Sequence, residues 1–313
     1  MRPKVLRRID YDVGEDLLEQ YRSGRMIVAG EEFDAVVQLA GGFGNQLFQY
    51  AFGMELKTVH DLNVGFDIEF YRQPNVVSHN RLQLIDLGFD VPIASRPEAA
   101  LEAARRLKWL PTRLQQSVVG LTYTKCPADR YVPVSISPGT NYFAGLWQSP
   151  KYFEGVQTDA RQLFRKHLLA ACETSHVTSE GVVGFHVRRG DYLTHAQSHK
   201  LDYLAYLSAA LDLLKEITGR SDLSVAVFSD DPEWCETHLS IPHVEVKRGG
   251  TMLDDFVGLM NCKHKIISNS TFAWWAAFLG ETNGLTIAPP RWHTATDIEE
   301  AQILMRDWHV VDY

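Results

Sequence analysis

Two adjacent arginines stand out in a chain that is otherwise acidic. Arg188 and Arg189 belong to the stretch HVRRGDYL, after the apolar run VVGF, and the 313-residue chain has a formal net charge of −8. A guanidinium group is a planar fork of donors that stays charged at any working pH, which suits phosphate oxygens. Beside a nucleoside diphosphate, it would stabilise the negative charge that grows as a glycosidic bond breaks. A structural clamp, in which both arginines pair with Asp191 and nearby carboxylates, explains the same residues equally well.

A pair of carboxylates, Asp230 and Asp231, closes another apolar run, SVAVFS. A carboxylate at this place can accept hydrogen bonds from the N1–H and the exocyclic amine of guanine, which adenine does not offer. Two other interpretations stay open. One aspartate can cap a helix that begins at Pro232, because Asp before Pro is common at helix starts. Alternatively, the acid pair can bind a metal ion.

Polar residues precede the apolar helical run AWWAAFL. The first N–H groups of a helix lack partners within it, and the helix dipole favours an anion there. The polar stretch therefore indicates an anion-binding helix N-terminus, although plain helix capping uses the same residue types. Trp274 and Trp275 are interpreted as core or cleft-wall residues, not as a platform for stacking a sugar. The polar residues are Ser268, Asn269, Ser270 and Thr271, and Phe272 follows them in the same stretch.

A glycine-rich turn, GGFGNQ, follows the apolar run AVVQLA. Because glycine has no side chain, Gly42 and Gly44 let the backbone approach a ligand closely. The turn also resembles a dinucleotide-binding fingerprint with Asp67 as the ribose-binding acid. However, Leu47 stands where the third glycine is required, and no phosphate-loop lysine follows.

A metal site is a weaker interpretation of the histidines. His186, Asp191, His195 and His199 match no standard ligand spacing, and 12 histidines in the chain leave room for chance. The four cysteines are scattered without a CxxC pair, which is typical of reduced thiols and not of a zinc site or a disulfide framework. The sequence therefore predicts neither a metal nor another cofactor.

The alternation of apolar runs predicts an α/β fold. In the second half, five strands alternate with four helices, which is typical of a doubly wound parallel sheet. In the first half, a strand at 34–40, a helix at 46–60 and a strand at 62–70 begin a similar layer. Further helices are expected at 16–21 and 97–110. Ligands of such sheets bind beyond the carboxyl ends of the strands, where the polar residues described above stand.

Composition limits the classes of protein that remain. A pI near 5.8 argues against a nucleic-acid-binding protein, which normally has a basic face. No run approaches the roughly 20 apolar residues of a membrane span, and no signal peptide is visible. We therefore expect a cytoplasmic protein without a transmembrane segment, which could work at the inner face of the membrane on membrane-attached acceptors.

Together and in this order, the motifs resemble the alpha-1,2-fucosyltransferase family, of the bacterial kind. The stretches that carry the resemblance are GGFGNQLFQYAFG, FHVRRGDYL, VFSDDPEWC and IISNSTFAWWAAFL, with weaker similarity in RLQLIDLGF, YFAGLWQSPKYF, LMNCKHKI and TIAPPRW. The similarity covers Asp34 to Trp292. Phe43 departs from the pattern, because leucine is more common there.

The resemblance implies a GT-B type fold, in which two Rossmann-like domains with parallel sheets face each other across a cleft. We expect an extension at 1–33, an acceptor-side domain at 34–170 and a GDP-fucose-binding domain at 171–313. The implied reaction is inverting, metal-independent transfer of L-fucose from GDP-fucose to the 2-hydroxyl of a terminal beta-galactoside. The closest alternative is another GDP-sugar donor. A nicotinamide-dependent oxidoreductase and an inactive carbohydrate-binding protein also remain.

The resemblance also assigns site residues. Arg188, Asn45 and Asp191 are the expected catalytic residues, with Arg188 on the pyrophosphate and Asp191 as a partner of the arginines. Asp230 or Asp231 is expected to bind guanine. The remaining expected donor-site residues are His186, Arg189, Ser268, Asn269, Ser270, Thr271, Phe272, Gly42, Phe43 and Gly44.

Overall fold

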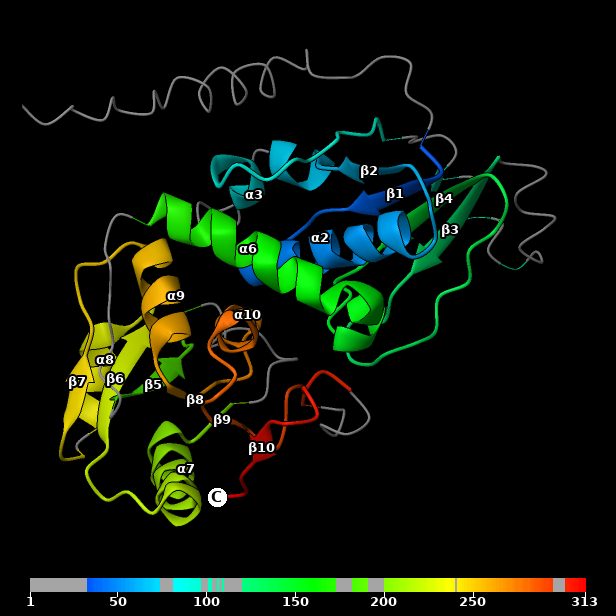
Figure 1. The fold of residues 1–313 in the computed structure, drawn as a ribbon. Coiled ribbons are helices and arrows are strands. Elements are labelled where there is room, and N and C mark those ends of the chain that lie inside the picture. Colours follow the sequence, from blue (N-terminus) through cyan, green and yellow to red (C-terminus); the bar gives the residue numbers. More distant parts are fainter. Residues whose placement is uncertain are drawn as a thin grey trace, which may run out of the picture.

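The computed structural model describes residues 33–73, 81–96, 101–102, 106, 109, 120–172, 182–190, 200–239, 241–294 and 302–313. These residues form two parallel sheets, one from each half of the chain, with helices packed between them (Figure 1). This is the α/β, two-sheet architecture of the GT-B type, so the predicted fold class is confirmed. The helix predicted at 16–21 and most of the one predicted at 97–110 lie outside the described residues.

The first sheet has the strand order β2-β1-β4-β3, and every neighbouring pair is parallel. Helix α2 connects β1 to β2. It begins at Phe43, three residues before the predicted start, because Gly42 is the extended N-cap and its carbonyl accepts the first helical hydrogen bonds. The strands are β1 (Ala35–Gln38), β2 (Val64–Asp67), β3 (Leu121–Lys125) and β4 (Thr140–Ala144), and α2 spans Phe43–Thr58.

Strand β2 is shorter than predicted. It ends at Asp67, because the Asp67 carboxylate accepts a hydrogen bond from the Glu69 N–H at 2.8 Å and starts a 3-10 turn. The remaining short elements of this half are η1 (Glu69–Arg72), α3 (Gln83–Asp86) and η3 (Pro150–Val156), followed by the long helix α6 (Gln157–Ala171).

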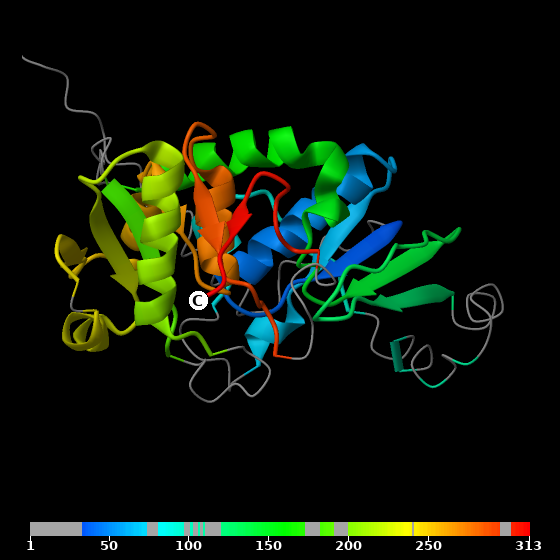
Figure 2. The same ribbon diagram turned by 90° about the horizontal axis from the view of Figure 1, so that it is seen from below.

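The second sheet has the order β10-β9-β8-β5-β6-β7, again parallel throughout (Figure 2). The five predicted strands and four predicted helices are all present, and β10 at the sheet edge is an addition that the sequence did not reveal. The strands are β5 (Val182–Val187), β6 (Ser224–Ser229), β7 (Val244–Val246), β8 (His264–Ile266), β9 (Thr286–Ala288) and β10 (His309–Val310). The helices are α7 (Tyr203–Thr218), α8 (Pro232–His238), α9 (Met252–Asn261) and α10 (Thr271–Leu279).

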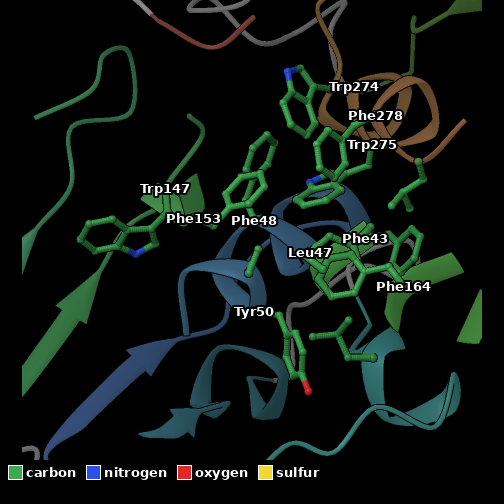
Figure 3. Packing of buried hydrophobic residues seen from close by; sticks show 14 of the residues in the cluster. Phe43, Leu47, Phe48, Tyr50, Trp147, Phe153, Phe164, Trp274, Trp275 and Phe278 are labelled. Carbon is green, nitrogen blue, oxygen red and sulfur yellow. The ribbon is translucent and has the colours of Figure 1, made fainter. Parts of the chain in front are cut away.

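Aromatic side chains join the two halves into one hydrophobic core (Figure 3). The ring of Phe48 on α2 lies 4.6 Å from Trp274 and 5.0 Å from Trp275, both on α10. Phe164 on α6 packs against Trp275 at 5.2 Å. Both tryptophans are fully buried, which confirms them as core residues. An interface this apolar favours a fixed arrangement of the two halves over a hinge.

Basic side chains surround the C-terminal end of α10. Arg161 and Arg165, both on α6, donate to the carbonyls of Gly280 and Leu279, respectively. A third basic residue, Lys265 on β8, is buried and donates to the Cys262 carbonyl at 2.5 Å. Burial lowers the pKa of Lys265 to about 8. Positive charge at this end complements the helix dipole, so the opposite end of α10 keeps its positive potential.

Candidate active site

The carboxyl ends of three neighbouring strands bring the predicted donor-site stretches together. In the second sheet β5 lies between β6 and β8, and Val187 of β5 pairs with Ser229 of β6. The residues that follow these strands therefore lie side by side. Arg188 and Arg189 meet the acid pair after β6, and Ser268 follows β8 on the other side.

His186, the penultimate residue of β5, is buried and held on two sides. Its Nδ1 lies 2.7 Å from the Ser268 hydroxyl, and its ring stacks on Phe272 at a centroid distance of 5.2 Å. Burial first, and then the charge of Arg188, lower the pKa of His186 to about 3. The imidazole is therefore neutral at working pH, and a pKa this low makes it a weak base.

The two arginines are paired with the two aspartates that follow β6. The Arg188 Nη1 lies 3.0 Å from the Asp230 carboxylate, and the Arg189 Nε lies 3.0 Å from Asp231. The Arg189 guanidinium also covers the ring of Trp234 at 3.9 Å. The predicted clamp thus exists with Asp230 and Asp231 as partners, whereas Asp191 lies outside the described residues.

Each aspartate also has a backbone role. Asp230 accepts hydrogen bonds from the N–H groups of Arg189 and Gly190, at 2.9 and 3.1 Å. Asp231 caps α8 through the Trp234 N–H at 3.2 Å, which confirms the capping interpretation for one of the pair. Its hydrogen bond with Arg189 lowers the pKa of Asp231 below the usual range. Both carboxylates therefore organise the loop that carries the arginines, and guanine binding by either stays a prediction.

The N-termini of α2 and α10 meet at Gly44. A Cβ atom on Gly44 would lie 2.4 Å from the carbonyl carbon of Thr271 and 2.6 Å from the Phe272 nitrogen, so no other residue fits. Ser270 is the N-cap of α10 and makes no side-chain capping bond. Because both helices start at the carboxyl end of a central strand, two positive helix termini converge on one place.

Not every residue of these stretches faces this place. Phe43 is buried and packs edge-on against Phe256 at 5.3 Å, so its ring serves the core. Asn269 is buried as well and donates to the Trp292 carbonyl at 3.0 Å. Ser270, Thr271 and Phe272 remain as the residues at the helix start.

Asn45 is held by Gln148, a residue of the first half of the chain that the sequence did not single out. The Gln148 side-chain amide donates to the Asn45 Oδ1 at 2.8 Å. Gln148 comes directly after Trp147 in the segment that follows β4. Trp147 adopts a left-handed φ of 54°, a backbone conformation that is rare for a bulky residue. The only signal in the sequence was its position in the stretch YFAGLWQSPKYF, a weak part of the resemblance.

Buried glutamines fix the glycine turn before Asn45. Gln49 accepts from the Ala40 N–H and donates to the Gly145 carbonyl, both at 2.9 Å, and so ties the ends of β1 and β4 together. Gln46 and Tyr71 both donate to the Gly41 carbonyl. Gly41 has a φ of +82°, which glycine adopts without strain.

Several residues that the sequence suggested as site residues are not among those brought together here. Asp191, His195 and His199 lie outside the described residues. Asp67, the ribose acid of the dinucleotide alternative, is buried and receives a hydrogen bond from the Tyr142 hydroxyl. A cavity of about 680 Å³ lies between η3 and the C-terminal segment, and none of the predicted site residues lines it.

Three further observations apply to the described residues. All four cysteines are free thiols. In the part of the chain that the structure covers, no three histidine, cysteine or acidic side chains gather as a metal site would require. Within the same part, none of the helices has the length and apolarity of a membrane span.

Comparison with known proteins defines the class of enzyme. The sequence pattern of glycosyl transferase family 11 matches residues 116–312, more than half of the chain. The fold and this match together define a glycosyltransferase. The chain belongs to glycosyl transferase family 11, which confirms the resemblance described above.

Individual relatives differ in the sugar that they are named for. An alpha-1,2-colitosyltransferase of Escherichia coli is 28% identical over 87% of this chain and 97% of its own length. A galactoside 2-alpha-L-fucosyltransferase, SEC1 of Bos taurus, is 37% identical, but over only 31% of this chain and 28% of its own. Among solved structures, the alpha-1,6-fucosyltransferase NodZ soaked with GDP-fucose aligns over 80% of this chain and 93% of its own, with a TM-score of 0.43 and 16% identity.

Replacing Gly44 tests whether the contact between the two helix starts forms the site. We expect Gly44→Ala to weaken GDP binding at least tenfold, because the new methyl group pushes the N-terminus of α10 away from α2. Overpacking of this kind typically costs about 1–3 kcal/mol of stability as well. GDP affinity is measured by calorimetry, and stability by thermal unfolding.

Gly53→Ala is the matched control. Gly53 lies on the same helix, and its added methyl group would press on the Phe66 ring at 2.6 Å, away from the helix start. It should lose stability and keep its GDP affinity. Equal GDP affinity in the Gly44 variant and the wild type would show that the contact is not needed for the site.

Proposed function

We propose that this glycosyltransferase transfers L-fucose from GDP-fucose to the 2-hydroxyl of a terminal beta-galactoside, with inversion at the anomeric carbon. The observation that carries the proposal is the fixed guanidinium of Arg188 at the end of β5, paired with Asp230 at 3.0 Å. Membership of family 11 supports sugar transfer. The names of the relatives, alpha-1,2-colitosyltransferase and galactoside 2-alpha-L-fucosyltransferase, support the linkage and a fucose-like donor.

On the donor side, the diphosphate is proposed to lie between Arg188 and the start of α10. Ser270 and Thr271 offer backbone N–H groups and hydroxyls there, and the helix dipole adds positive potential. Arg189 and neutral His186, held by Ser268 and Phe272, complete this side. The guanidinium of Arg188 then stabilises the charge that develops on the leaving phosphate.

On the acceptor side, Asn45 is proposed to face the reacting sugar. Its side chain is fixed by Gln148 across the ends of β1 and β4. An amide orients hydroxyl groups by hydrogen bonds but does not act as a base. On this proposal, Asn45 positions the acceptor or the fucose ring.

The acceptor hydroxyl must also lose its proton during the transfer. Inversion requires the hydroxyl to attack the face opposite GDP, and an ordinary single displacement would use a general base. Among the described residues, His186 is a weak base with a pKa of about 3, and Asp67 is buried between Tyr142 and Arg96. We propose a dissociative displacement, in which the bond between fucose and GDP breaks first and Arg188 stabilises the departing diphosphate. The acceptor hydroxyl then bonds to the anomeric carbon and releases its proton to water.

The identity of the donor is tested directly. Colitose is L-fucose without its 3-hydroxyl, so a colitose donor is the alternative that the Escherichia coli relative favours. The purified enzyme is incubated with lactose and, separately, with GDP-fucose, GDP-colitose and GDP-mannose, and the products are analysed by mass spectrometry and NMR. We expect fucosylation at the 2-hydroxyl of galactose with an alpha anomeric signal. Transfer from GDP-colitose or GDP-mannose in place of GDP-fucose would refute the donor assignment.

Replacing Arg188 tests the role of its fork. Arg188→Lys keeps the positive charge but loses the paired donors, so turnover should fall by about a hundred- to a thousandfold, as on loss of an oxyanion-type donor. The measurement is kcat for fucose transfer, with thermal unfolding to check the fold. Lys215→Arg is the control, because this exposed residue of α7 pairs only with Asp212 among the ion pairs of the described residues. Near-normal turnover of Arg188→Lys would remove the role proposed for Arg188.

Removal of metal ions tests the source of positive potential. We propose that the arginine pair and the N-terminus of α10 replace a divalent ion, so transfer should keep its full rate in excess EDTA. The rate of GDP release is measured before and after chelation and after adding manganese. A rate that falls with EDTA and returns with manganese would contradict the proposal and assign Asp230 and Asp231 to a metal.

A further inference from the structure

One phenol group holds the backbone of Arg188. The Tyr203 hydroxyl accepts a hydrogen bond from the Arg188 N–H at 3.1 Å and donates one to the Arg188 carbonyl at 2.5 Å. Strand β5 ends at Val187, so both groups of Arg188 lie just beyond the hydrogen-bond ladder of the sheet. Backbone groups in a half-buried loop need partners, and a single side chain provides both here.

Tyr203 is itself rigidly placed. It is the first residue of α7, whose N-cap Asp202 accepts from the Ala205 N–H at 3.1 Å. Its ring is buried and packs edge-on against Phe185 of β5 and Trp234 of α8, with centroids about 6 Å away. The phenol is therefore anchored by the strand before Arg188 and by the helix after the acid pair.

Arg188 is thus fixed at both ends, its backbone by Tyr203 and its guanidinium by Asp230 at 3.0 Å. A shift of its backbone moves the root of the side chain, so the guanidinium can return to the same place only in a different side-chain conformation. Effective charge stabilisation in the transition state requires donors that are already in place.

We propose that Tyr203 is a positioning residue, which holds the backbone of Arg188 so that the guanidinium meets the leaving phosphate in the correct geometry. This inference rests on the proposed function. It extends the set of residues on which fucose transfer depends to a tyrosine 15 positions away in the sequence. Tyr203 does not touch the substrate on this view and acts only through Arg188.

Tyr203→Phe tests the inference, because it removes only the hydroxyl. We expect kcat for fucose transfer to fall by about ten- to a hundredfold, as a misplacement of about 1 Å can cost a hundredfold. The dissociation constant of GDP should change less than threefold, since the other donor contacts remain.

The chain offers a closely matched control in Tyr152. Its hydroxyl accepts from the Val132 N–H at 2.9 Å and donates to the Val132 carbonyl at 3.1 Å, and its ring is buried. Tyr152→Phe therefore loses an equivalent pair of backbone hydrogen bonds away from the arginines, together with a weaker one from the Cys126 thiol at 3.3 Å. Both variants should lose similar stability in thermal unfolding, and only Tyr203→Phe should lose turnover.

A double-mutant cycle shows whether Tyr203 acts through Arg188. In the Arg188→Ala background, Tyr203→Phe should lower kcat no further, because there is no fork left to position. If the wild type transfers fucose but Tyr203→Phe turns over like Tyr152→Phe, the positioning role is overturned and the proposed function stands. The same holds if the losses caused by Tyr203→Phe and Arg188→Ala multiply in the double variant. A wild type that does not transfer fucose from GDP-fucose overturns the proposed function first, and the inference with it.

Discussion

The contact between the starts of α2 and α10 is the constraint on which the rest of the site depends. The two helices approach so closely at Gly44 that a methyl group would collide with the backbone of Thr271. Each helix follows a central strand of its own sheet, so this one contact brings the carboxyl ends of both sheets together. The glycine turn after β1 and the start of α10 therefore meet at one place, where the positive ends of two helix dipoles lie close together.

The aromatic core behind this contact keeps it in place. Phe48, Phe164 and the tryptophans of α10 pack across the two halves, so separation of the sheets would expose several large rings to water. At its far end α10 is held by Arg161 and Arg165 through their hydrogen bonds to its last carbonyls. A helix fixed at its C-terminus and along its length presents its N-terminus in one position, which is what a preorganised anion site requires.

The sequence predicted the places where strands end better than the contacts made there. Apolar runs identified the strands that carry His186, Asp230 and Ser268, and the parallel order of an α/β fold put them on one edge. The pairing of Arg188 with Asp230 depends on β5 and β6 being neighbours in register, which no local pattern encodes. Gln148 and Tyr203 act through hydrogen bonds to residues 103 and 15 positions away, so their residue types alone gave no signal. Strand β10 is two residues long, too short for any periodicity to show.

The structural clamp and the phosphate site, which the sequence left as alternatives for the arginines, are compatible in the folded protein. Arg188 and Arg189 are each paired with one aspartate, so the cluster is close to neutral before a ligand binds. Asp230 accepts hydrogen bonds from two backbone N–H groups in addition to its ion pair with Arg188. It therefore keeps its place if the guanidinium turns toward a phosphate. The aspartates thus fix the loop that carries the arginines. The helix N-termini, which carry no net charge, then supply the additional positive potential that the proposed binding of a diphosphate by an acidic protein requires.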